Sequence, residues 1–270
     1  MDMDMDKAME LFKNNTVVSW HEHVYINETT RRLDYTQCDR LAKVGELLHI
    51  NKIVVSRPVW WGVETPELTT IHNNVVSEAI NRYAGLMYGM CFIDPHHGKT
   101  ALSEIDRCIT DLGFIGVKLY NQRAIDDPLQ YPIIEKCIKL DIPILMHAGK
   151  GSAPYSERHP LQSDGSHFLN IAKRYPEAVF IIGHIGGGGD WHWQLKEMGS
   201  CPNVFIDIGG SVYDHGIVEE TVAVFGADRV LFAADMSFSA SVGKLLGAEI
   251  NGDDKITILA GARMAKYFKN

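Results

Sequence analysis

The chain has 270 residues, 46% of them hydrophobic and 22% charged, a composition typical of a globular protein rather than a disordered or fibrous one. A formal net charge of −8 with no run of Lys or Arg argues against a nucleic-acid partner, which needs a concentrated basic face. No segment approaches the roughly 18 consecutive apolar residues of a membrane span, and no signal-peptide pattern opens the chain, so we expect a cytoplasmic protein without a membrane partner.

Short apolar runs alternate with helical patterns along the chain. The runs predict eight strands, over residues 17–20, 52–57, 85–93, 114–119, 142–147, 178–183, 203–207 and 229–234. The first helix is expected to be capped by Asp34 or Thr36 and to reach residue 48. Further helices are predicted over residues 71–80, 102–112, 129–140, 165–175, 190–198, 216–225 and 253–268.

Strands that alternate with helices at this spacing imply a parallel sheet, either closed as a barrel or open as a doubly wound layer. Residues that can bind a metal or move a proton follow the first, fourth, fifth, sixth and eighth strands. An open sheet gathers its site at one switch point, whereas a barrel gathers it from many strand ends. We therefore predict a single α/β domain over residues 1–270, an eight-stranded parallel (β/α)₈ TIM barrel with outer helices and an extra C-terminal helix.

The residues at these strand ends suit a metal site. They are His21, His23, Lys118, His147, His184 and Asp235. His21 and His23 lie two apart and should project to one face of their strand. With a third imidazole and a carboxylate they make an N₃O set with open positions for water, the pattern of a catalytic zinc site. The same ligands suit Mn²⁺, Fe²⁺ or Co²⁺, and Asp235 or His184 could act as the base.

Sulfur is not part of this set. The five cysteines are widely spaced and lie mostly inside apolar patterns, so we expect reduced core thiols. They are Cys38, Cys91, Cys108, Cys137 and Cys201.

The ordered motifs resemble those of the amidohydrolase superfamily. They are His21-x-His23, Gly116-Val117-Lys118, His147-Ala148-Gly149, Gly183-His184-Ile185-Gly186-Gly187 and Asp235. The closer likeness is to the amidohydrolase-related branch that includes aminocarboxymuconate-semialdehyde decarboxylase. The resemblance implies that His21, His23, His147 and Asp235 bind one divalent ion, with Zn²⁺ as the first candidate. It also implies that His184 orients the attacking water or polarises the substrate.

Lys118 has two interpretations. In the binuclear branches, a lysine at the fourth strand is carboxylated and bridges two metals, which would recruit His147 and His184 to a second ion. The alternative is a free ammonium that binds a substrate carboxylate or is satisfied by carboxylates of the barrel.

Cations and aromatic residues near the predicted mouth favour a small anionic substrate. The candidate substrate contacts are Arg57, Trp60, Tyr120 and Arg158. The leading hypothesis is a metal-dependent hydrolase that uses metal-activated water on an amide, ester or lactone bond. The alternative is a non-oxidative decarboxylase, a carbon–carbon lyase, that uses the same site. A third hypothesis is a binding protein that kept the barrel and lost catalysis. Association into a homo-oligomer stays open, because no surface patch indicates an interface.

Overall fold

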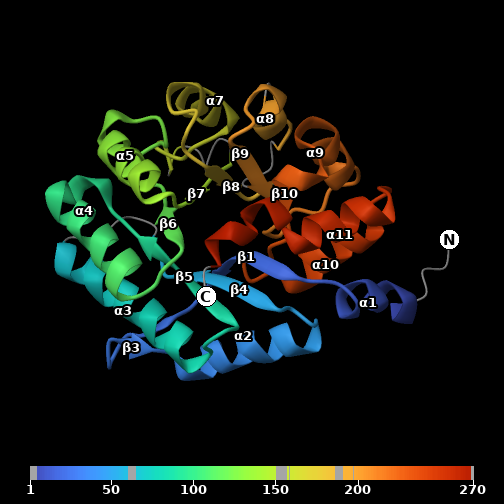
Figure 1. Cartoon of the computed structure of the whole chain (residues 1–270), viewed down its shortest axis with the longest axis horizontal. Coiled ribbons are helices and arrows are strands. Elements are labelled where there is room, and N and C mark those ends of the chain that lie inside the picture. The colour runs from blue at the N-terminus through green and yellow to red at the C-terminus, as the bar shows by residue number, and fades with distance from the viewer. Residues whose placement is uncertain are drawn as a thin grey trace.

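The computed structural model describes residues 5–59, 65–149, 157, 159–185, 191–196 and 198–268. It confirms the predicted (β/α)₈ barrel: eight parallel strands lie side by side in chain order and helices surround them (Figure 1). The strands are β1 (Val18–His23), β4 (Lys52–Ser56), β5 (Met87–Phe92), β6 (Gly116–Leu119), β7 (Ile144–His147), β8 (Phe180–Gly183), β9 (Val204–Asp207) and β10 (Val230–Leu231). Each corresponds to a predicted apolar run, although β10 is shorter than predicted.

The helices around the barrel largely follow the predicted periodicity. They are α1 (Met5–Lys13), α2 (Tyr35–Leu47), α3 (Pro66–Arg82), α4 (Lys99–Asp106), α5 (Tyr131–Leu140), α7 (Gly165–Arg174), α8 (His192–Leu195), α9 (Ile217–Phe225), α10 (Phe238–Gly247) and α11 (Gly252–Ala260). A π-helical turn, Arg107–Asp111, extends α4, and a 3₁₀ helix, Ala262–Tyr267, follows α11. Asp34 caps α2 by accepting a hydrogen bond from the backbone of Gln37.

Two α-helices and one hairpin were not predicted from the sequence. They are α1, the short antiparallel hairpin of β2 (Ile26–Asn27) and β3 (Arg32–Leu33), and α10. The small residues of α10 give it no clear polar face, which explains why its periodicity was missed. Its Lys244 is nevertheless buried and reaches the barrel, so this helix matters for the site.

The barrel closes between its first and last strands through backbone hydrogen bonds. Trp20 N donates to Phe232 O at 3.0 Å, and Asp235 N donates to His21 O at 2.8 Å. β1 also contains a bulge, because Ser19 pairs with Ile53 while Glu22 pairs with Val55. Three steps along β1 therefore match two along β4, which changes the face on which the following side chains lie.

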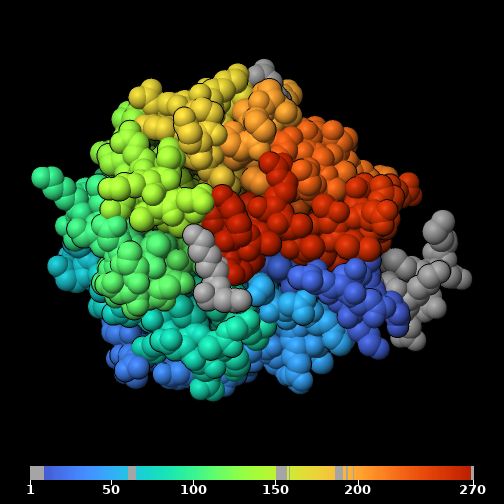
Figure 2. Space-filling model, viewed as in Figure 1, coloured from blue at the N-terminus to red at the C-terminus, as the bar shows by residue number. Residues whose placement is uncertain are grey.

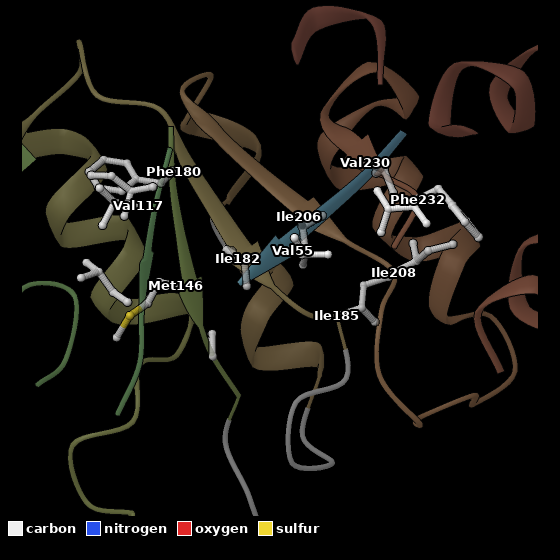
Figure 3. Packing of buried hydrophobic residues seen from close by; sticks show 14 of the residues in the cluster. Val55, Val117, Met146, Phe180, Ile182, Ile185, Ile206, Ile208, Val230 and Phe232 are labelled. Atoms are coloured by element: carbon white, nitrogen blue, oxygen red, sulfur yellow. The ribbon is translucent and has the colours of Figure 1, made fainter. Parts of the chain in front are cut away.

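Alternate residues of the strands form two separate hydrophobic clusters. One cluster lies between the strands and the outer helices, and Figure 3 shows its side chains, such as Val117, Phe180 and Ile206, on several strands. The other fills the barrel interior with residues such as Trp20, Leu145 and Phe205. It includes Met264 and Tyr267 of the C-terminal 3₁₀ helix, and this red segment lies over the middle of the face seen in Figure 2.

The C-terminal 3₁₀ helix closes one end of the barrel. The ring of Phe268, which follows it, lies 4.7 Å from the ring of Tyr88, near the start of β5. Lys52, the first residue of β4, also lies over Phe268. The closed end is therefore the one where strands begin, and the mouth is left at their carboxyl ends.

The predicted state of the cysteines is confirmed. All five are buried and free of disulfides. Among the described residues, none of the helices combines the length and apolar character that a membrane crossing requires.

Candidate metal centre at the barrel mouth

A pocket of about 350 Å³ opens at the carboxyl ends of the strands. It is lined by His23, Tyr25, Arg57, Pro58, Tyr120, His147, Asp235 and Met236. These residues come from the ends of β1 and β7 and from the segments after β1, β4, β6 and β10. Residues far apart in the sequence therefore meet at one mouth, as barrel topology requires.

Three of the predicted ligands converge at the base of this pocket. One donor atom each from His21, His23 and Asp235 lies within 4.8 Å of the others, and no other such group of three occurs among the residues described. Asp235 Oδ1 is 3.0 Å from His23 Nε2 and 3.8 Å from His21 Nε2. Two imidazole nitrogens and a carboxylate oxygen fit the donor preferences of a divalent transition-metal ion.

The imidazole of His21 is oriented for this role by a buried carboxylate. Its Nδ1 donates to Asp207 Oδ2 at 2.9 Å, since a carboxylate can only accept. The Nε2 lone pair then faces Lys118 and Asp235, and a carboxylate on the other ring nitrogen is commonly found behind a metal-binding histidine. Gly183 leaves room for the ring, because an added Cβ would lie only 2.8 Å from His21 Cε1.

His184 and His147 lie beside this group in different ways. His184 Nε2 is 3.3 Å from Asp235 Oδ2, so the carboxylate lies between His184 and the two histidines of β1. His147 lines the pocket but is not part of the group of three donors. Its ring stacks on Tyr120 at 4.2 Å, and its Nε2 is 3.4 Å from Gln162 Nε2. Its centroid lies 5.0 Å from that of His184.

Burial controls the charge of the histidines at this mouth. Desolvation lowers the pKa of His21, His147 and His184, and the nearby Lys118 ammonium lowers each of them further. The imidazoles are therefore held neutral, the form that binds metals. Burial alone would raise the pKa of Asp235, but the surrounding histidines outweigh it and keep that pKa well below its usual range.

Lys118 is completely buried, and its Nζ lies 2.7 Å from His21 Nε2. Burial lowers its pKa to about 8, while Asp235 and Asp207 act in the opposite direction. Such an amine is neutral more often than a surface lysine, which suits carboxylation. The same position near two carboxylates also suits a free ammonium, so both interpretations of Lys118 stay predictions.

The predicted substrate contacts are only partly described. Arg57 and Tyr120 line the pocket, whereas Trp60 and Arg158 lie outside the described residues. Arg57 Nη1 donates to the backbone of Pro58, and its buried Nε has no hydrogen-bond partner among the described residues. Arg57 is thus a cation in the pocket wall, and its Nε–H group has no acceptor among the described residues.

Three buried residues near the site were missed by the sequence analysis. Asp207 ends the seventh apolar run, the same signal that identified Asp235. Lys244 of α10 donates to the carbonyls of Gly209 and Gly210, and burial lowers its pKa to about 8. Glu22 lies between the two histidines of β1, and burial raises its pKa to about 8 although its hydrogen bonds act in the opposite direction.

The fold and this geometry define a class of protein: a TIM barrel with a histidine–carboxylate cluster at the carboxyl ends of its strands. The amidohydrolase family model matches residues 49–248. The chain belongs to the amidohydrolase family, and the resemblance identified from its motifs is confirmed.

The chain is also similar to two characterised enzymes, at low sequence identity. A 2-keto-4-carboxy-3-hexenedioate hydratase from Sphingobium sp. is 26% identical over 195 residues, which cover 61% of this chain and 57% of the relative. A gamma-resorcylate decarboxylase from Polaromonas sp. is 21% identical over 220 residues, covering 62% of this chain and 64% of the relative. The match therefore spans less than two thirds of either relative.

Solved structures share the fold over almost the whole chain. A 2,6-dihydroxybenzoate decarboxylase from Rhizobium has a TM-score of 0.73 and 18% identity, covering 93% of this chain and 99% of its own. A dihydroxybenzoic acid decarboxylase from Polaromonas sp., with bound manganese and the inhibitor 2-nitroresorcinol, has a TM-score of 0.70 and 16% identity, covering 94% and 97%.

Proposed function

We propose that this chain is a metal-dependent non-oxidative decarboxylase and that it forms one barrel domain. Its proposed substrate is a small carboxylic acid that contains a planar ring or a conjugated chain. The main supporting observation is the group of His21, His23 and Asp235, the one such group among the described residues. Two of its members, His23 and Asp235, line a pocket of about 350 Å³ together with Arg57. Relatives that share the fold or family are decarboxylases of hydroxybenzoates and a hydratase of a carboxylated keto acid. The hydrolase hypothesis has no such support, so the decarboxylase alternative is preferred.

One divalent ion would be held by His21, His23 and Asp235, with His147 in reach from the same pocket wall. Zn²⁺ was the first candidate from the ligand types, and manganese in the Polaromonas structure makes Mn²⁺ an equal one. When bound, the ion supplies positive charge and Lewis acidity near the substrate oxygens.

Arg57 is proposed to bind an acidic oxygen that stays in the product, a ring hydroxyl or a second carboxylate. Its guanidinium lines the pocket, and its Nε has no partner among the described side chains, so an incoming acidic oxygen would complete its hydrogen bonding. Tyr120 supports one wall, because its ring is held by stacking on His147. A flat substrate fits between such a wall and a cation.

His184 and Asp235 are proposed to manage the proton. When CO₂ leaves, the electron pair of the broken carbon–carbon bond stays on the substrate carbon, which must then take up a proton. Burial lowers the pKa of His184, so its imidazole is neutral at rest. Once it takes up a proton from solvent at Nε2, it is a strong acid that delivers that proton to the carbon. Asp235, 3.3 Å away and held ionised, stabilises that protonated form until transfer.

The decisive experiment follows the fate of carbon and oxygen atoms. The protein would be incubated with 2,6-dihydroxybenzoate and with carboxylated keto acids in H₂¹⁸O, and CO₂ and product mass would be measured. We expect CO₂ release without ¹⁸O in the organic product. Removal of metal by a chelator should stop the reaction, and Mn²⁺ or Zn²⁺ should restore it.

Other outcomes of the same assay identify the competing functions. Addition of one water with no loss of CO₂ would indicate a hydratase, as in the Sphingobium relative. Metal-dependent cleavage of an ester or lactone of these acids, with ¹⁸O in the acid product and no CO₂, would restore the hydrolase. Full activity after complete metal removal would overturn all metal-dependent mechanisms.

A further inference from the structure

Glu22 lies between the two histidines of β1, but its carboxylate contacts the segment that follows β10. Val18 and Trp20 face the barrel interior, so simple alternation along β1 would turn Glu22 inward as well and would turn His21 and His23 outward. Because of the bulge between Ser19 and Glu22, the Glu22 side chain instead reaches the seam between β1 and the segment after β10. The side chain is completely buried and does not line the pocket.

Both carboxylate oxygens of Glu22 accept hydrogen bonds from the turn that holds Asp235. Oε1 accepts from Ala234 N at 3.0 Å, and Oε2 accepts from Met236 N at 2.9 Å. Ser19 Oγ also donates to Oε1, at 2.6 Å. Since Asp235 N donates to His21 O, three consecutive backbone amides of this turn are bonded to β1.

The turn needs this support because its backbone is strained. Asp235 and Met236 have φ angles of 44° and 65°, in the left-handed region that non-glycine residues avoid. This conformation is unfavourable for a non-glycine residue and persists only where surrounding contacts impose it. In return, the Asp235 carboxylate is directed at His21, His23 and His184.

We propose that Glu22 is a positioning residue that sets the Asp235 carboxylate for metal binding by holding both backbone amides that flank it. The inference rests on the proposed metal-dependent function and deepens it. A carboxylate suits the position because its two oxygens accept from two backbone amides and one hydroxyl. A glutamine offers only one accepting oxygen, and its NH₂ group would face another donor.

The test is a measurement of Mn²⁺ affinity on the full chain after chelator treatment, for the unmodified protein and for Glu22→Gln. We expect the Kd of Glu22→Gln to be about 10–100-fold weaker, the usual effect of removing support behind a metal ligand. The matched control is Glu104→Gln. Glu104 is also a buried carboxylate with several donors, but its partners Asn73 and Arg107 lie outside the barrel interior.

The control separates positioning from general stability. Glu104→Gln should lower Tm yet keep the Mn²⁺ Kd within about twofold, whereas Glu22→Gln should weaken the Kd even where its melting is cooperative. A Kd for Glu22→Gln within twofold of the unmodified protein would overturn the inference and leave the proposed function standing. An unmodified protein that binds neither Mn²⁺ nor Zn²⁺ would overturn the proposed function itself, and with it any role of Glu22 in metal binding.

A second variant decides the matter if Glu22→Gln does not fold. Ser19→Ala removes one hydrogen bond to the same carboxylate and leaves Glu22 in place. We expect a milder loss, with a Kd at least threefold weaker. An unchanged Kd in this folded variant would count against the inference.

Discussion

The two ends of the barrel interior contain opposite kinds of side chain. At the end where strands begin, the interior is filled by Val18, Phe205 and Tyr267, and the C-terminal 3₁₀ helix covers it. At the carboxyl ends, His21, Lys118 and other charged or titratable groups are equally buried. Burying such groups costs free energy unless they are paired, so the apolar end stabilises the fold, while the polar end is retained for its chemistry.

The comparison predicts that a change at the polar end removes activity and leaves the fold. Asp235→Ala should reduce turnover roughly 10³-fold or more, since it removes both a proposed metal ligand and the partner of His184. Steady-state kinetics and thermal melting would check this. Asp228→Ala, an exposed carboxylate paired with Arg263, should change neither quantity. A fully active Asp235→Ala would show that the mouth is not the site.

A change at the apolar end should do the reverse. Phe205 is 4% exposed and lies in the interior cluster. Phe205→Ala is expected to lower the free energy of unfolding by about 3–5 kcal/mol through lost contacts and a cavity. Urea unfolding would measure this, with metal content per chain as the second quantity. Phe205→Ala could instead lose its metal at urea concentrations below those that unfold it. The apolar and polar ends of the barrel interior would then not be independent.

Asp207 tests how far the polar end extends beyond the pocket. Asp207→Asn keeps the shape of the side chain, but its amide can also donate to His21 Nδ1, so the tautomer of His21 is no longer fixed. We expect the Mn²⁺ Kd to weaken about 10–100-fold. The ¹⁵N shifts of the His21 ring, measured without metal, should move toward a mixture of tautomers. Asp39→Asn, at a surface pair with Arg82, should leave both measurements unchanged.

The sequence predicted those parts of this comparison that depend on local pattern. His21, His23 and Asp235 were identified because each follows an apolar run, and barrel topology brings strand ends together wherever the exact register falls. All eight strands were found for the same reason. The small and apolar residues of α10 have no such periodicity, so the helix that carries Lys244 was missed.

The rest depends on contacts between distant segments. The bulge in β1 turns Glu22 toward Ala234, and no local pattern in the sequence indicates a bulge. Asp207 had the right signal but was assigned to the strand alone, because a carboxylate behind a ligand is recognised only once its partner imidazole is located. Separate predictions for each strand end cannot distinguish a ligand from the residue that orients it.

A buried base outside the group of candidate metal ligands predicts a separate effect of pH on stability. His72 of α3 is 8% exposed, and its Nδ1 has no hydrogen-bond partner among the described residues. Burial, with help from Arg57 and Arg31, lowers its pKa from 6.5 to about 4. Between pH 6.5 and about pH 4, the unfolded chain therefore binds a proton at His72 and the folded chain does not. Stability present above pH 6.5 is then lost as the pH falls toward 4.

His72→Gln should remove this part of the acid sensitivity while keeping a polar side chain of similar reach. We expect the fall in Tm between pH 7.5 and pH 5 to be a few degrees smaller in the variant, since a change of about 1 kcal/mol moves Tm by roughly 2–4 °C in a chain of this size. Thermal melts at both pH values would measure it, with the exposed His215→Gln as the control that should follow the unmodified protein. An equal fall in Tm for His72→Gln would mean that burial of His72 does not cause the acid sensitivity. The histidines at the mouth would then be its source.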